Sequence, residues 1–184
     1  MEFEYSYNST TTESINENLI YEDFQNLKTQ EIISYISLYF NNLINQNYKN
    51  KNKKKERQND DFYSRKIPLL TIEKYLNRII KYTQIEKSTL IISFIYILHI
   101  IGKGKYIICK NNIYRLILSS CLIAFKFNEE KNYFKNSYFG KIGGINLNEI
   151  NFLEYSILSK INYQLYIDEN EFYFLVEQII KNEK

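Results

Sequence analysis

The sequence of 184 residues is poor in the residues that interrupt helices, bind metals or cross-link chains. One proline and five glycines leave room for long, uninterrupted helices. Two cysteines, Cys109 and Cys121, and a single histidine, His99, are too few for a common zinc site or a disulfide framework. We therefore expect reduced thiols, no metal, no cofactor, and a location in the cytoplasm, the nucleus or both.

Long hydrophobic runs and an N-terminal signal peptide are also missing. The most apolar run, residues 90–101, is shorter than the ~20 residues that a membrane-spanning helix needs. The acidic start MEFEYSYNSTTTE has neither the basic nor the apolar region of a signal peptide. The apolar run is therefore interpreted as a core helix, and no membrane partner is expected.

No arrangement of residues typical of a catalytic site is present. The sequence has no Ser-His-Asp or Cys-His pairing, no zinc-ligand spacing and no glycine loop of the phosphate-binding kind. Gly143 and Gly144 are better explained as a helix stop. We predict a protein that is not an enzyme and that binds no small molecule.

Positive charge is concentrated in one short run. Residues 49–57, KNKNKKKER, hold six basic residues and one acid, a net charge of +5, whereas the whole chain is only +3. The rest of the chain therefore sums to −2, which argues against a basic surface for nucleic acid. We predict a solvated linker over residues 48–66, with a nuclear-import signal as the alternative function of the run.

Most of the remaining sequence has helical periodicity, with apolar residues recurring every three or four positions. The stretches with this period are residues 28–47, 72–80, 86–101, 112–127, 136–143, 146–163 and 168–180. Thr71 and Asn146 are expected to cap helices, as is Asp168 or Asn170. No stretch alternates with a period of two between turn residues, so we predict an all-α protein.

The helix predicted at 112–127 is expected to be the centre of the fold. It is apolar on nearly every side, which is typical of a helix surrounded by others. We therefore predict a bundle of five helices around this central helix. The predicted organisation is a disordered segment at 1–27, an N-terminal helix at 28–47, the linker at 48–66, the bundle at 67–167 and a C-terminal helix at 168–184.

Two charged residues interrupt apolar faces of predicted helices. Lys126 lies between two phenylalanines at the end of the central helix, and Glu154 lies on the apolar stripe of the helix at 146–163. Lysine and glutamate are rarely buried without a partner. The two residues are therefore either separate solvated charges at the edges of their helices or a pair.

These stretches together resemble the cyclin box, and in particular the fungal phosphate-system cyclins and the plant and protist P/U-type cyclins. The matching pieces are TIEKYLNRIIKYT at 71–83, NIYRLILSSCLIAFKF at 112–127 and NSYFGKIGGINLNEINFLEYSIL at 136–158. The last piece is the most specific of the three. The resemblance covers about residues 28–167 and implies one cyclin box, because too few residues follow for a second.

The resemblance implies a regulatory subunit that binds and activates a cyclin-dependent kinase by pressing on the kinase C-helix. In that family a lysine at the end of the third box helix and a glutamate in the fifth bind the kinase, and here they match Lys126 and Glu154. The apolar kinase-binding neighbours match Ile123, Phe127, Leu158, Tyr163 and Leu165. Simple core packing is the alternative interpretation of these five residues.

One position departs from the family pattern. Where the family has an aspartate that pairs with an arginine of the first box helix, this chain has Leu98, and the arginine is matched by Arg78. Arg78 is therefore either free or paired with another acid. His99 occupies a family arginine position and is expected to be a surface or core residue rather than a ligand.

Phosphate signalling and cell-cycle control are both consistent with the resemblance. The alternatives to a kinase regulator are an orphan cyclin-fold scaffold and a cyclin-fold transcription factor that does not activate a kinase. The negative charge outside the linker argues against the transcription factor, and the replaced aspartate keeps the scaffold open.

Overall fold

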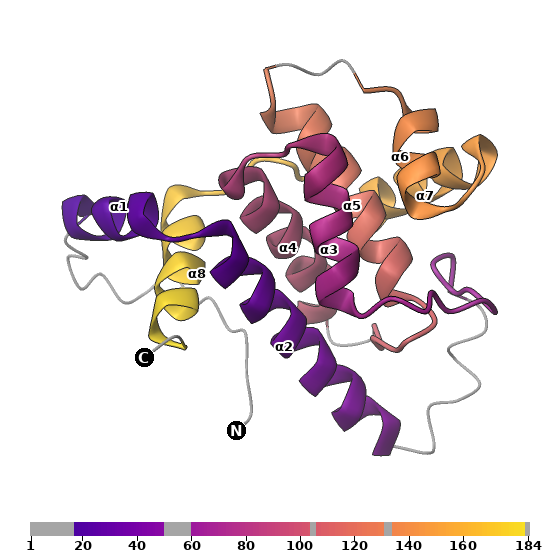
Figure 1. Ribbon diagram of the computed structural model, residues 1–184, viewed down its shortest axis with the longest axis horizontal. Coiled ribbons are helices and arrows are strands. Elements are labelled where there is room, and N and C mark those ends of the chain that lie inside the picture. Colours follow the sequence, from indigo (N-terminus) through magenta and orange to yellow (C-terminus); the bar gives the residue numbers. More distant parts are fainter. Residues whose placement is uncertain (1–16, 50–59, 104–105, 131–133, 183–184) are drawn as a thin grey trace.

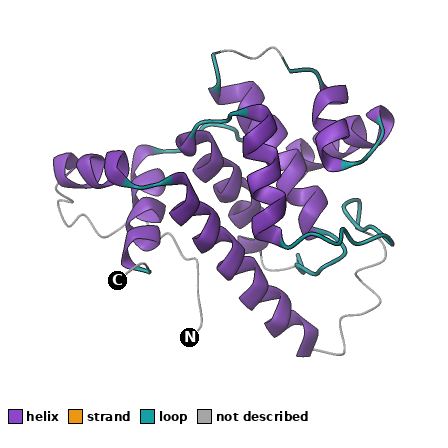
Figure 2. Ribbon diagram, viewed as in Figure 1, coloured by secondary structure: helices purple, strands orange, loops and turns teal. Residues whose placement is uncertain are grey.

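The protein is described by a computed structural model that covers residues 17–49, 60–103, 106–130 and 134–182. These ranges contain helices and no strand, which confirms the all-α prediction (Figure 1 and Figure 2). The helices are α1 (Glu17–Asn26), α2 (Thr29–Lys49), α3 (Ile72–Thr83), α4 (Lys87–Gly102), α5 (Ile113–Asn128), α6 (Asn136–Gly143), α7 (Leu147–Lys160) and α8 (Glu169–Lys181).

Helix α5 is the centre of the bundle, as its all-round apolar sequence predicts. It packs against α3, α4, α6 and α7, and every residue from Leu116 to Phe125 is buried. The buried Ser119 and Ser120 hydroxyls donate to carbonyls of their own helix, at 2.8 Å to Arg115 O and 3.0 Å to Ile117 O. The small polar residues therefore sit in the core without losing hydrogen bonds.

Local capping fixes where the box helices begin and end. The side chains of Thr71, Asn146 and Asp168 accept hydrogen bonds from backbone N–H groups in the first turns of α3, α7 and α8, as predicted. Helix α6 ends at Gly144, whose φ of +72° favours glycine. A side chain at Gly143 would clash with Leu118 of α5, so this glycine also permits close packing of α6 on α5.

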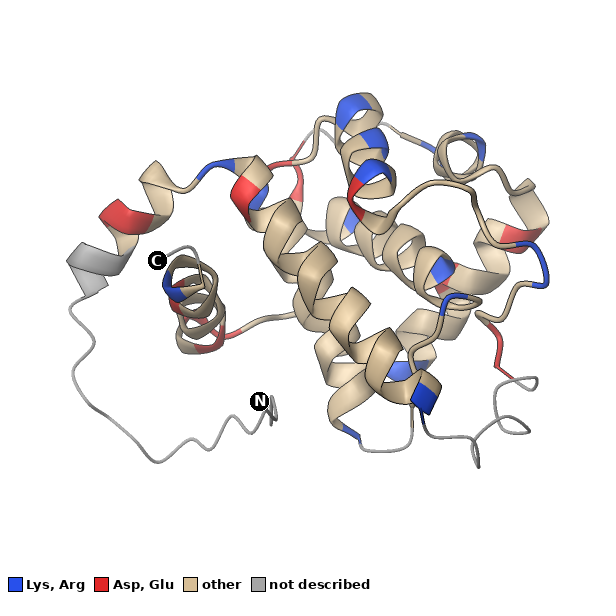
Figure 3. Cartoon of the chain, turned by 60° about the horizontal axis from the view of Figure 1, so that its bottom comes forward, with Lys and Arg blue, Asp and Glu red and all other residues tan. Residues whose placement is uncertain are grey.

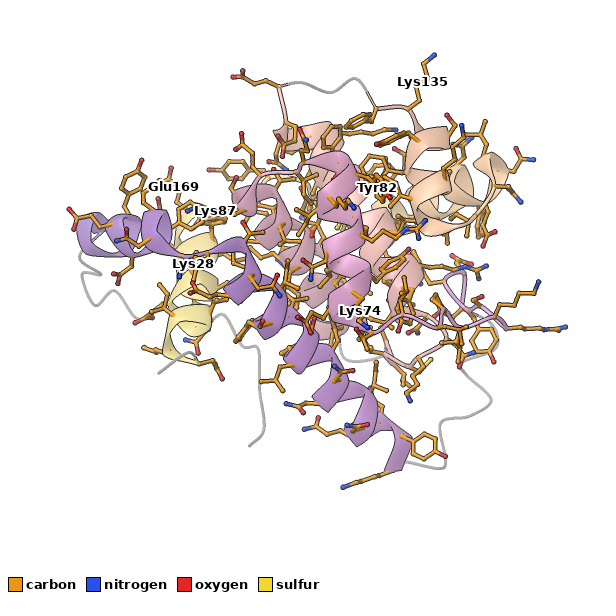
Figure 4. All side chains as sticks on the ribbon, in the orientation of Figure 1. Lys28, Lys74, Tyr82, Lys87, Lys135 and Glu169 are labelled. Carbon is orange, nitrogen blue, oxygen red and sulfur yellow. The ribbon has the colours of Figure 1, made fainter. Side chains whose placement is uncertain are left out.

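The predicted disordered segment at 1–27 is wrong for its last third, because α1 occupies Glu17–Asn26. Its end packs into the core, where Phe24 and Leu27 are buried. The ammonium of Lys87, at the start of α4, donates to Phe24 O at 2.7 Å and to Gln25 O at 2.9 Å (Figure 4). A cation on the last carbonyls of a helix satisfies unpaired acceptors and complements the helix dipole. Residues 1–16 lie outside the described ranges.

The predicted linker at 48–66 is also shorter than expected. Helix α2 continues to Lys49, and the segment 60–64 contacts the bundle. Phe62 is fully buried, and Asp60 accepts a hydrogen bond of 2.6 Å from the Tyr106 hydroxyl. The predicted linker therefore contains an aromatic anchor, Phe62, and its residues 50–59 lie outside the described residues.

Three further features of the described residues concern their charges, their hydrophobicity and their cysteines. Basic and acidic residues are interspersed along the described helices and loops (Figure 3). None of the described helices has the length and hydrophobicity to cross a membrane. Within the same ranges, no three His, Cys, Asp or Glu side chains are grouped as a metal site would require. Burial raises the pKa of the Cys121 thiol to about 12, so this cysteine is a protonated core residue.

Candidate partner-binding surface

Lys126 and Glu154 form an ion pair between α5 and α7. Lys126 lies in the last turn of α5, and its Nζ donates to Glu154 Oε1 at 2.5 Å. Both side chains are partly buried. The interpretation as two separate solvated charges is therefore wrong, and the alternative of a pair describes the structure.

A second helix end fixes the carboxylate of Glu154. The side-chain amide of Asn136, the first residue of α6, donates to Glu154 Oε2 at 2.6 Å and to Asn151 Oδ1 at 2.7 Å. One oxygen of Glu154 thus bonds the lysine and the other bonds the asparagine. No pattern in the sequence pointed to Asn136, because an asparagine at the start of a helix is common.

The five apolar candidates divide into buried and exposed residues. Ile123 is buried in the core, as the packing alternative predicts, and Leu158 and Leu165 are half-buried. Phe127 and Tyr163 are 52% and 60% exposed. Phe127 directly follows the lysine of the pair, and Leu158 lies one turn after Glu154. The exposed phenylalanine and tyrosine are available to a partner.

The turn after α7 holds Tyr163 in an unusual backbone conformation. Asn162 and Tyr163 have φ values of +56° and +58°, which is rare for a residue with a large side chain. The Tyr163 N–H donates to Leu158 O at 2.8 Å, and the buried Tyr96 hydroxyl donates to Leu165 O at 2.7 Å. Burial raises the pKa of Tyr96 to about 12, so the hydroxyl remains a neutral donor. The turn is therefore held at both ends, as strained turns at functional sites often are.

The replaced aspartate does not leave Arg78 without a partner. Leu98 is buried in the core, and the Arg78 guanidinium Nε donates to the Ile142 carbonyl at 2.9 Å. The expectation that Arg78 is free or paired with an acid is wrong, because a backbone carbonyl of α6 takes the place of the acid. The orientation of Lys126 does not depend on the replaced aspartate, because Glu154 holds its ammonium.

His99 forms a contact that the sequence did not predict. Its Nε2 lies 2.6 Å from Glu171 Oε1, and the pair joins α4 to α8. Its place between two helices agrees with the expected structural role.

A second ion pair joins α5 to α7 at the opposite end of α5. Arg115 bonds the carboxylate of Glu149 and the carbonyl of Tyr63. No sequence pattern indicated this pair, because Arg115, Glu149 and Tyr63 come from segments far apart in the chain.

The fold is an all-α bundle in which other helices surround the buried α5, with no strand in the ranges that the structure describes. A family model described as Cyclin matches residues 27–165 of the chain. The chain therefore belongs to the cyclin family, and the match agrees with the predicted range of 28–167. Members of this family are regulatory subunits rather than enzymes.

The curated relatives of the chain include plant cyclins of the U and P types, as the sequence motifs predict. Cyclin-U2-1 and Cyclin-U3-1 of Arabidopsis thaliana are 35% and 33% identical to it over 112 residues, and Cyclin-P3-1 of Oryza sativa subsp. japonica is 28% identical over 111. The alignments cover 60%, 61% and 60% of this chain and 50%, 50% and 47% of the relatives. The chain thus spans about half the length of the curated relatives it matches.

Proposed function

We propose that the chain is a regulatory subunit of a cyclin-dependent kinase and binds the kinase through the surface around Lys126 and Glu154. The observation that carries the proposal is the fixed ion pair with exposed Phe127 directly beside it. Interfaces of high affinity combine large apolar anchors with charges held in place before binding. The other members of the proposed surface are Leu158, Tyr163 and Leu165, and Ile123 is buried beneath them.

The ion pair supports this role through its geometry. The bond to Glu154 holds the Lys126 ammonium in place, so its positive charge is presented to backbone carbonyls of a kinase from a fixed position. Glu154 is held by Asn136 as well, so the pair loses little conformational freedom when a partner binds. Ile123, beneath this surface, acts through packing rather than contact.

The proposed mechanism follows from what a kinase needs. A protein kinase is active when the lysine of its third strand pairs with a glutamate of its C-helix and the ATP phosphates are held correctly. A rigid helical surface that binds the C-helix in this inward position favours the active state by differential affinity. The cyclin would contribute no catalytic group.

The biological setting belongs to the same proposal. The resemblance to phosphate-system and P/U-type cyclins supports a role in phosphate signalling or cell-cycle control. The low cysteine content supports action in the cytoplasm, the nucleus or both.

Affinity capture from the native cells, followed by mass spectrometry, tests the proposal. The tagged wild-type chain is expected to enrich a cyclin-dependent kinase, and Lys126→Ala is expected to lose it. Lys81→Ala, which changes an exposed lysine of α3, is the matched control and should retain the kinase. Capture without any kinase would contradict the proposal and favour a scaffold.

A further inference from the structure

A cleft lies at the end of α5 that is far from Lys126. Its volume is about 620 Å³, within the ~300–1,000 Å³ typical of ligand pockets. Its walls come from the segment before α3, the first turns of α3 and α5, and the turn between α6 and α7. Arg115 and Lys126 are eleven positions apart on α5, so the cleft is about 16 Å from the proposed kinase surface at ~1.5 Å per residue.

The lining of the cleft carries more positive than negative charge. Arg65, Lys66 and Arg115 line it together with one carboxylate, Glu149. Arg115 already bonds this carboxylate, whereas Arg65 and Lys66 are exposed at the rim. The charge that remains for a ligand is therefore positive, which favours an anionic group.

A tyrosine hydroxyl also faces the cleft. Tyr75 is 96% buried as a residue and lines the cleft, and its hydroxyl lies 3.2 Å from the position of a β-carbon built on Gly143. Among the residues that the structure describes, this hydroxyl has no hydrogen-bond partner, and the oxygen itself is not enclosed by the protein, so it is open to the cleft. A neutral phenol in this position can donate to an anionic oxygen of a ligand.

Part of the rim is apolar, and the segment that forms it is fixed. Ile67 lines the cleft and is exposed, and Leu69, two residues further along, is exposed completely. The Tyr114 hydroxyl donates to Leu70 O at 2.6 Å, and the Ser64 N–H donates to Asn111 O at 2.8 Å. These bonds hold the segment before α3 in place, so the cleft and its apolar rim are formed before any ligand binds.

We propose that this cleft binds an acidic peptide segment of a partner protein, in which carboxylate side chains are followed by bulky apolar ones. The carboxylates would bond Lys66, Arg65 and the Tyr75 hydroxyl, and the apolar side chains would cover Ile67 and Leu69. Because the cleft lies at the other end of α5, the peptide would bind with or without a kinase, so the proposal stands apart from the proposed function.

Fluorescence anisotropy with the full chain tests the proposal. The probe is a labelled short peptide with two glutamates followed by two leucines in a glycine–serine frame. It is expected to bind about tenfold more tightly than peptides with lysines in place of the glutamates or serines in place of the leucines. Equal or tighter binding of the lysine peptide would overturn the proposal.

Variants of the chain locate the bound peptide. Lys66→Glu should weaken binding about tenfold, whereas Lys81→Glu, the same charge change at an exposed lysine of α3, should alter it less than about twofold. Tyr75→Phe should weaken binding severalfold without lowering the melting temperature, because the hydroxyl has no partner within the described residues. Equal effects of the two lysine changes would overturn the proposal. A second result would also overturn it: the chain binds no peptide, but it self-associates, and Lys66→Glu abolishes this self-association.

Discussion

Two ion pairs join α5 to α7 from opposite ends of α5, and their surroundings differ. Near the start of α5, Arg115 pairs with Glu149 of α7. In the last turn of α5, Lys126 pairs with Glu154 of α7. Both pairs are partly buried, so neither charge nor burial separates them. What distinguishes the pairs is the third group that each cation or carboxylate bonds.

The third group assigns each pair to a different role. Arg115 also bonds the carbonyl of Tyr63 and so attaches the segment before α3 to the bundle. Glu154 also bonds Asn136, the first residue of α6, and Phe127, which directly follows Lys126, is exposed. We infer that the first pair stabilises the fold and that the second presents a fixed charge to a partner. An ion pair alone would not show which is which.

The largest expected effect concerns the segment that Arg115 holds. Phe62→Ala removes a fully buried aromatic ring next to Tyr63 and should lower the free energy of unfolding by ~3–5 kcal/mol. Denaturant unfolding of both proteins measures this difference. The control replaces residues 50–58 by a short glycine–serine bridge and should change stability little. A small effect of Phe62→Ala would mean that the segment does not contribute to the fold.

Arg115→Ala is expected to have a moderate effect on stability. It removes the bonds to Tyr63 and Glu149 and leaves a partly buried carboxylate without its partner, which should cost ~1–3 kcal/mol. Thermal unfolding measures the loss. Kinase affinity per folded molecule should stay unchanged. A fall in that affinity would contradict the inference that only the Lys126–Glu154 pair takes part in binding.

The smallest expected effect is that of Asn136→Ala. The change removes one hydrogen bond from Glu154 but leaves its pair with Lys126, so kinase affinity should fall by about three- to tenfold. Isothermal titration calorimetry with the captured kinase can resolve a change of this size. Asn151→Ala, which removes the other side-chain partner of Asn136, is the control and should bind almost normally. An equal loss in both variants would show that Asn136 acts through α6 rather than through Glu154.

Features encoded by local spacing were predictable from the sequence. The buried α5 follows from its apolar positions, and the starts of α3 and α7 follow from Thr71 and Asn146. A cap needs only residues three positions apart, and a buried helix needs only its own composition. The motifs within residues 112–158 indicated the cyclin family for the same reason, since each motif consists of residues close together in the chain.

Contacts between distant segments were not predictable in this way. Phe62 lies in the segment 48–66 that the charged run predicts to be a linker, and only its burial in the bundle shows that it is an anchor. The partners of Arg78, Arg115 and Glu154 come from other helices or loops, so no spacing along the chain identifies them. Which group bonds each of these side chains depends on where the fold places carbonyls, carboxylates and amides.

The central claim is that Lys126 and Glu154 act as one unit in binding a kinase. Kinase affinity and melting temperature should be measured together for Lys126→Ala, Glu154→Ala and the double variant. Each single change should weaken binding by ~2–5 kcal/mol, roughly 30-fold to several-thousand-fold, with little change in melting temperature. The double variant should lose less than the sum, because coupled residues are not additive. Unchanged affinity in both single variants, with a lowered melting temperature, would contradict the account and make the pair a stabilising contact of the fold.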